Sequence, residues 1–139
     1  MQSVSRTARV DKSKSKRSIL VVDDEKWLVE SLDLALRKHK YNVIPAYSYD
    51  DAIAALQREK IDLIVTDIAM ERKDGLQLVK EVRENPRFKE LPVIVQSGFG
   101  DQMQKEAIAL KARAVFQKPV KMEDLLWAIH DALGTKTKK

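Results

Sequence analysis

The stretch IDLIVTDIAMERKDG, residues 61–75, places an acidic residue directly behind a run of apolar residues. Its first part, Ile61–Thr66, is mostly apolar without a regular alternation, which is typical of a strand covered on both faces of a sheet. Asp67 ends this run, and a polar loop leads on to Gly75. Acidic residues are common in turns, so Asp67 indicates a site only if reactive side chains also follow the other strands.

Outside this stretch, short apolar runs alternate with segments of helical periodicity. The spacing of Leu32 and Leu36 is typical of the apolar face of a helix. Ser48 and Asp51 have the spacing of an N-terminal capping box, and Gly134 lies where a C-cap glycine belongs. We therefore expect strands at Ile19–Val22, Tyr41–Ala46, Ile61–Thr66, Pro92–Gln96 and Ala112–Gln117, and helices at about 26–39, 49–60, 75–84, 101–111 and 122–133.

This alternation of strands and helices predicts an α/β fold of three layers. Short apolar strands separated by amphipathic helices imply a parallel sheet with helices on both faces, and right-handed crossovers with short loops leave few topologies. The expected fold is a doubly wound, five-stranded parallel sheet in one domain, residues 18–134. The chain has 139 residues, of which 44% are hydrophobic, and this is enough for one core of that kind.

The two ends of the chain are basic, unlike the domain between them. Residues 1–17 carry a net charge of +5 and residues 135–139 one of +3, so residues 18–134 carry −3 of the total of +5. We predict a disordered basic tail at each end. No aromatic residue accompanies the basic residues of either tail, so we do not expect nucleic-acid binding within this chain.

The composition also bounds the cellular setting. The chain has no cysteine, which excludes disulfides and thiolate metal sites and is compatible with a reducing compartment. No apolar run is long enough to span a bilayer, and the polar, basic N-terminus is unlike a secretory signal. We therefore expect a cytoplasmic protein that does not insert into membranes.

The residues behind the strands are expected to meet, because the carboxyl ends of parallel strands lie along one edge of a sheet. Those residues are Asp23, Asp24, Asp67, Ser97 and Lys118. Three carboxylates so close together repel one another unless a cation joins them. A set of oxygen ligands suits a hard ion, Mg²⁺ or Mn²⁺, and a lysine and a hydroxyl suit the oxygens of a phosphate group.

Four short motifs carry these residues: VVDDE at 21–25, VTDIAM followed by DG between 65 and 75, VIVQSG at 93–98, and KPV at 118–120. In this order and spacing they resemble the response regulator receiver domain of two-component signalling, over about residues 18–134. The resemblance implies a flavodoxin-like sheet in the strand order 2-1-3-4-5. It also implies a cis peptide bond between Lys118 and Pro119.

The resemblance further implies a metal-dependent phosphoacceptor. Asp67 would be the nucleophile that receives a phosphoryl group. Asp24, Asp67 and the backbone carbonyl of Ala69 would bind Mg²⁺ directly, with Mn²⁺ as a substitute, and Asp23 would act through water. The chemistry fits, because in-line phosphoryl transfer depends on positioning and charge neutralisation.

Ser97 and Lys118 would bind the phosphoryl group, and the phosphoryl donor would be a sensor histidine kinase or a histidine phosphotransfer protein. A receiver of this kind phosphorylates and dephosphorylates itself and does not turn over external substrates. Its new charge and acceptor oxygens would switch the binding of an output partner, which the sequence does not identify.

The sequence departs from the family pattern in two places. Between Asp67 and Gly75, the family often has MPGMDG where this chain has MERKDG. Three residues before the lysine, many receivers carry a Tyr or Phe that rotates inward, and this chain has Val115; the adjacent Phe116 should point to the opposite face. We therefore expect the aromatic half of the switch to be missing or rerouted. Trp127 lies off the apolar stripe of its helix and is a candidate for a partner face.

Three other functions compete with a phosphorylated switch. A receiver-like protein-interaction module, with little or no phosphorylation-driven switching, would be compatible with Val115 and the altered loop. A phosphohydrolase using Asp67 on external substrates would usually need a second acid two residues on, where Ala69 stands. A nucleic-acid regulator would need an effector domain or recognition helix, and neither is visible in the sequence.

Overall fold

The computed structural model describes residues 16–68, 75–98 and 101–134. The strands are β2 (Ser18–Val22), β3 (Asn42–Ala46), β4 (Leu63–Asp67), β5 (Val93–Ser97) and β6 (Ala114–Gln117). The helices are α1 (Lys26–Lys38), α2 (Tyr49–Arg58), α3 (Gly75–Glu84), α4 (Asp101–Ala109) and α5 (Met122–Leu133). The tail predictions for residues 1–15 and 135–139, and Ala69 with the rest of 69–74, lie outside the described residues.

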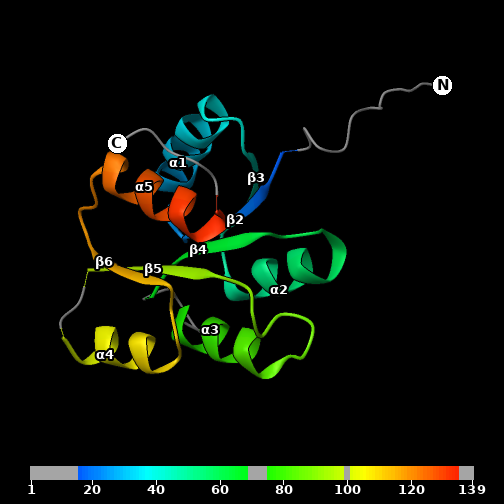
Figure 1. Ribbon diagram of the computed structural model, residues 1–139, viewed down its shortest axis with the longest axis vertical. Helices are drawn as coiled ribbons and strands as arrows, with labels where there is room; N and C mark the ends of the chain where they lie inside the picture. The colour runs from blue at the N-terminus through cyan, green and yellow to red at the C-terminus, as the bar shows by residue number, and fades with distance from the viewer. Residues whose placement is uncertain (1–15, 69–74, 99–100, 135–139) are drawn as a thin grey trace.

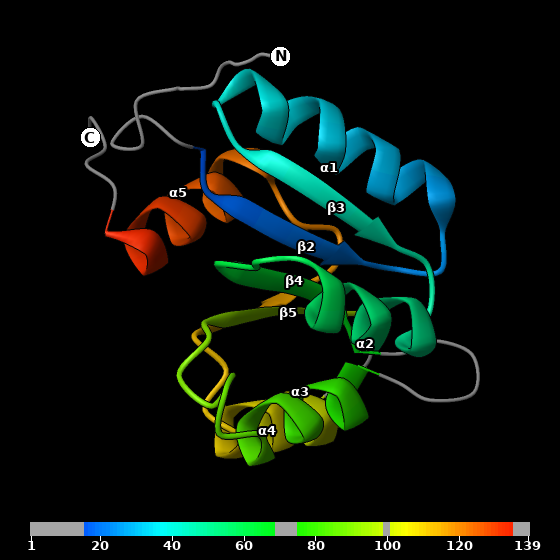
Figure 2. The ribbon, with the colours of Figure 1, turned by 90° about the vertical axis from the view of Figure 1, so that its right-hand side faces the viewer.

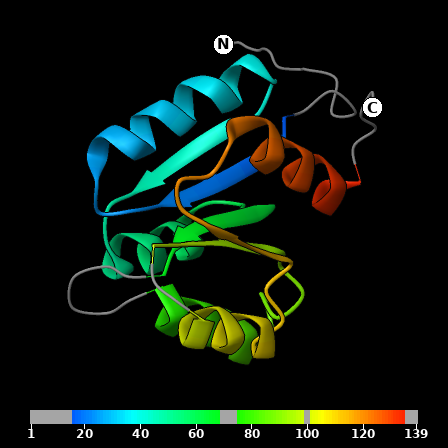
Figure 3. The same ribbon diagram turned by 90° about the vertical axis from the view of Figure 1, so that its left-hand side faces the viewer.

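The described strands form one parallel sheet in the order β3-β2-β4-β5-β6, which in chain order is the predicted 2-1-3-4-5 (Figure 1). Helices cover both faces, with α1 and α5 on one side and α3 and α4 on the other (Figures 2 and 3). Residues of α2 belong to the same core as those of α3 and α4. The predicted three-layer, doubly wound architecture is therefore confirmed. None of the helices among the described residues has the length and apolar character to cross a membrane.

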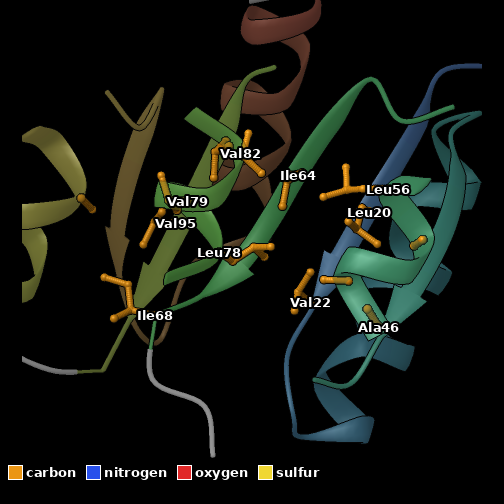
Figure 4. Packing of buried hydrophobic residues seen from close by; sticks show 14 residues of the cluster. Leu20, Val22, Ala46, Leu56, Ile64, Ile68, Leu78, Val79, Val82 and Val95 are labelled. Carbon is orange, nitrogen blue, oxygen red and sulfur yellow. The ribbon is translucent and has the colours of Figure 1, made fainter. Parts of the chain in front are cut away.

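A separate hydrophobic core fills each side of the sheet. Ile64 and Val95 face α2, α3 and α4 and form what we call the α2–α4 core (Figure 4). Their chain neighbours Val65 and Ile94 face α1 and α5 and form the α1–α5 core. Each such buried side chain stabilises the fold by about 1.5–3 kcal/mol. Because the side chains of a strand alternate, the last residue of each strand is committed to one face or the other.

Local hydrogen bonds begin and end the helices. The Ser48 Oγ accepts from the Asp51 N–H at 3.0 Å and caps α2 as predicted. The Asp51 carboxylate in turn accepts from the Tyr47 N–H at 3.0 Å, one residue before the position that a capping box uses. Gly134 caps α5 in the left-handed conformation, with φ of 70°, which glycine adopts without strain.

Gly75 allows α3 to start directly against the end of β4. A Cβ at this position would lie 2.0 Å from the carbonyl oxygen of Asp67, so a larger residue would displace the strand end. The Gly75 N–H donates to the carbonyl of Ile68 at 2.5 Å. The backbone of Asp67 is thereby fixed between the sheet and the first turn of α3.

Arg83 connects the ends of α3 and α4 at the amino edge of the sheet. Its guanidinium donates to four backbone carbonyls at 2.7–3.2 Å: those of Lys89, Leu91, Leu110 and Lys111. Two of these carbonyls belong to the segment between α3 and β5, and two follow the end of α4, so Arg83 joins both segments to its own helix. No structural role was predicted for Arg83 from the sequence.

Three of the predicted boundaries differ from the structure by two residues for identifiable reasons. β4 starts later than predicted, because Asp62 uses its side chain and its backbone to bind the start of β2. Its Oδ2 accepts from the Ser18 N–H, and its N–H donates to the Ser18 carbonyl, both at 2.8 Å. α4 ends at Ala109, and Lys111 follows with a left-handed φ of 65°, which stops the helix and delays β6.

Candidate functional site

Three carboxylates meet at the carboxyl edge of the sheet. Val22 pairs with Thr66 in the β2–β4 ladder, so the next residues, Asp23 and Asp67, are neighbours. Asp23, Asp24 and Asp67 each have a carboxylate oxygen within 4.8 Å of the others. Asp23 and Asp67 are buried, with 2% and 6% of their surface exposed, whereas Asp24 is exposed. The structure thus brings together the three acids that the strand ends predicted.

Lys118 reaches these acids from the end of β6. Its Nζ donates to Asp23 Oδ2 at 3.1 Å and lies 3.4 Å from Asp67 Oδ2. Burial opposes the ammonium charge, but hydrogen bonds and attraction from the two carboxylates outweigh it and raise the pKa of Lys118. The Lys118 N–H also donates to the Ser97 carbonyl at 2.8 Å. The peptide bond between Lys118 and Pro119 is cis, as predicted.

Ser97 is fully buried at the end of β5 and belongs to the other face of the sheet. It follows Val95 by two residues, and Val95 packs in the α2–α4 core. Asp67 follows Val65 by two residues, and Val65 packs in the α1–α5 core. A group carried by Asp67 would therefore have Ser97 on the α2–α4 side and Lys118 on the α1–α5 side.

The position that holds an aromatic in many receivers is a half-buried valine. Val115 packs against the α2–α4 core, and Phe116 packs against the α1–α5 core. The expectation that these two neighbours face opposite sides is confirmed. The face to which Ser97 belongs therefore carries Val115 and no aromatic from this strand.

The backbone at the end of β2 holds Asp23 in place. Its N–H donates to the Ala46 carbonyl at 3.1 Å, and its Oδ1 accepts from the Glu25 N–H at 3.0 Å. Its second oxygen, Oδ2, accepts from Lys118. Both oxygens of this buried carboxylate are therefore engaged, while the neighbouring Asp24 is exposed.

The donor set fits a hard divalent cation. Asp23, Asp24 and Asp67 bring three carboxylates together, and Lys118 contacts two of them, Asp23 and Asp67. All the carboxylate ligands are oxygens, which Mg²⁺ prefers. The Ala69 carbonyl, expected as a further ligand, lies outside the described residues.

One buried polar residue beside this cluster, Gln96, was not predicted to have a role. Gln96 pairs with Asp67 in the β4–β5 ladder and is only 8% exposed. In the sequence it stands within the run VIVQSG and was included in a predicted strand without a role of its own. The available signal was an amide inside an otherwise apolar strand, but its proximity to Asp67 depends on the register of two strands.

The sheet order, the acidic cluster and the lysine beside it define a receiver-like α/β protein. The chain matches the model of the response regulator receiver domain over residues 19–130. It is 36% identical over 118 residues to the transcriptional regulatory protein GlrR of Escherichia coli (strain K12). That match covers 83% of this chain and 26% of GlrR, so the chain spans about a quarter of the length of this curated relative.

Solved structures agree with this assignment. A response regulator receiver protein from Pseudomonas putida is 30% identical, with a TM-score of 0.80 over 84% of this chain and 97% of that one. A CheY-like response regulator receiver domain protein from Methanospirillum hungatei JF-1 is 25% identical, with a TM-score of 0.81 over 86% and 95% of the two chains. The chain therefore belongs to the response regulator receiver domain family of two-component systems.

Proposed function

We propose that Asp67 receives a phosphoryl group from a phosphohistidine in an Mg²⁺-dependent transfer, and that this transfer switches the binding of a partner. The supporting observation is the acidic cluster, in which three carboxylates lie within 4.8 Å of one another and one lysine contacts two of them. Carboxylates this close repel one another unless a cation joins them, so their arrangement favours a bound metal ion. The phosphohistidine would belong to a histidine kinase or a histidine phosphotransfer protein.

Mg²⁺ would neutralise charge on the acceptor and on the incoming phosphoryl oxygens. The proposed direct ligands are Asp24, Asp67 and the Ala69 carbonyl, and Mn²⁺ would replace Mg²⁺ on the same oxygens. Asp23 already accepts hydrogen bonds on both oxygens, from the Glu25 N–H and from Lys118. This engagement supports an indirect role for Asp23, through water.

The chain's own residues would carry the transfer. A carboxylate oxygen of Asp67 attacks the phosphorus in line, the bond from phosphorus to the imidazole nitrogen breaks, and that nitrogen keeps the electron pair. Lys118, with its Nζ 3.4 Å from Asp67 Oδ2, offsets the charge that the phosphoryl group adds. The Ser97 hydroxyl, on the other side of the acceptor, donates to a phosphoryl oxygen.

Two exposed tryptophans are candidate contact and reporter residues. Trp27 is 63% exposed and follows Asp24 by three residues, so its fluorescence should change when Mg²⁺ binds. Trp127 on α5 is 44% exposed and is the proposed contact for an output partner, because exposed aromatics are enriched at interfaces.

The test is phosphate incorporation. Wild-type protein incubated with Mg²⁺ and acetyl phosphate should gain one phosphate by intact-protein mass spectrometry, and Asp67→Asn should gain none. Asp50→Asn removes an exposed acid at the start of α2 and should behave as wild type. A wild-type chain that incorporates no phosphate would overturn the proposal.

A receiver-like interaction module is the second candidate, and Val115 is the observation that favours it. Without an aromatic at this position, the α2–α4 side lacks the side chain whose rotation is expected to transmit the switch. Such a module would bind its partner equally well with and without phosphorylation. Partner affinity measured for wild type and for Asp67→Asn, each with acetyl phosphate and Mg²⁺, separates the two functions.

A further inference from the structure

Gln96 stands in a row of side chains that crosses the sheet at the level of Asp67. The β4–β5 ladder sets Gln96 beside Asp67, and the β5–β6 ladder sets it beside Phe116. Residues paired in this way point to the same face, and neighbouring strands lie about 4.8 Å apart. Phe116 packs against the α1–α5 core. The side chain of Gln96 therefore starts about one strand spacing from Asp67, on the face from which Lys118 approaches.

The side-chain amide of Gln96 is buried and makes no hydrogen bond to any of the described residues. The residue is 8% exposed, and in the part of the chain that the structure describes no hydrogen bond of its side chain is found. Its backbone carbonyl is engaged, because it accepts from the Ile68 N–H at 2.9 Å. A buried amide without partners costs free energy, and an apolar side chain of the same size would avoid that cost. Packing alone therefore does not account for this residue.

We infer that Gln96 is a further phosphoryl-binding residue, whose side-chain N–H donates to an oxygen of the group that Asp67 carries. This inference rests on the proposed function. A phosphoryl group brings acceptor oxygens to within reach of a donor that is otherwise unsatisfied. Lys118 crosses from β6 to contact Asp67 and Asp23, so it passes over β5, the strand of Gln96. Gln96 thus supplies a neutral donor between the lysine and the acceptor.

The hydrogen bond exists only when the phosphoryl group is present, so it shifts the equilibrium toward the phosphorylated state. Beryllofluoride, a stable phosphoryl mimic that binds to aspartate carboxylates, measures this shift without hydrolysis. Gln96→Met keeps the volume and removes the donor, and it should weaken beryllofluoride binding in the presence of Mg²⁺ about tenfold, or about 1.4 kcal/mol. Gln96→Glu should weaken it more, because a carboxylate repels the anionic group.

Thermal unfolding separates this role from a structural one. Without beryllofluoride, Gln96→Met should unfold at the wild-type temperature or above it, since the variant removes an unsatisfied buried amide. A side chain that only supported the fold would lower the unfolding temperature and leave the affinity unchanged. Gln57→Met, at an exposed position of α2, controls for the exchange of side-chain types and should match wild type in both measurements.

The outcomes distinguish this inference from the function on which it rests. If wild type binds beryllofluoride and both Gln96 variants bind it equally well, Gln96 does not contact the phosphoryl group and the inference is wrong. If wild type itself binds no beryllofluoride in the presence of Mg²⁺, the proposed function fails and the inference fails with it.

Discussion

The two edges of the sheet both hold charged side chains, but the charges are satisfied in different ways. At the amino edge, the Arg83 guanidinium donates to four backbone carbonyls. At the carboxyl edge, Lys118 contacts the two buried acids, Asp23 and Asp67, and the exposed Asp24 lies beside them. A charge with a full set of partners holds elements together. Like charges gathered in one place repel one another and favour a ligand of the opposite sign.

Replacing Arg83 should have the largest effect on stability. Arg83→Met leaves four carbonyls, two between α3 and β5 and two after α4, without this donor, and we expect a loss of about 2–3 kcal/mol in the free energy of unfolding. Urea denaturation followed by far-UV circular dichroism measures it. Arg87→Met removes a more loosely held arginine, which stacks on Phe88 at 4.8 Å, and should cost less than about 1 kcal/mol. Equal losses in the two variants would show that the four hydrogen bonds of Arg83 do not make it more important for stability than Arg87.

Magnesium should act only at the carboxyl edge. At a hundredfold excess over its dissociation constant, Mg²⁺ should stabilise wild type by roughly 2.7 kcal/mol, seen as a higher unfolding temperature. Asp24→Asn should lose most of this increment, and Arg83→Met should keep it despite its lower starting stability. A wild-type unfolding temperature that is indifferent to Mg²⁺ would contradict the metal assignment.

Replacing Asp24 by asparagine should not destabilise the metal-free protein. In the presence of a chelator, Asp24→Asn relieves repulsion between neighbouring carboxylates. Its free energy of unfolding should equal that of wild type or exceed it by up to about 0.5 kcal/mol, the range of exposed charges. If the two edges differ as described, Arg83→Met lowers the free energy of unfolding and Asp24→Asn does not. A clear destabilisation by Asp24→Asn would show that this acid, too, serves the fold.

The smallest expected effect concerns pH and His130, in the last turn of α5. Its Nδ1 is hydrogen-bonded to the Tyr41 hydroxyl, and its ring lies 5.9 Å from that of His39. Burial first, and then the charge of His39, lower the pKa of His130. Because the unfolded chain takes up this proton at about pH 6.5, the stability is fully present above that pH and is lost as the pH falls below it.

His130→Gln should therefore weaken the dependence of the unfolding temperature on pH between about 7.5 and 5.5. His39→Gln should weaken it less, because burial is the larger cause of the lowered pKa. A profile that is the same in His130→Gln and wild type would mean that the loss of stability in mild acid arises elsewhere in the molecule.

The sequence predicted most of the acidic edge because strand ends are visible in it. Asp24, Asp67 and Lys118 each follow an apolar run, and the parallel sheet brings them together whatever the details of packing. Gln96 could not be placed in this way, because its position beside Asp67 depends on the pairing register of β4 and β5. The hydrogen bonds of Arg83 could not be predicted, because its acceptors lie 6 to 28 residues further along the chain, in two separate turns.

The pairing of Val22 with Thr66 has a consequence for how the site comes into being. A slip of one residue between β2 and β4 would send one of the two buried acids to the opposite face of the sheet. Partly folded chains in which these two strands have not yet paired lack the cation site altogether. The apparent affinity of the proposed cation site should therefore report the fraction of molecules whose central strands are correctly aligned, and not the state of any single loop.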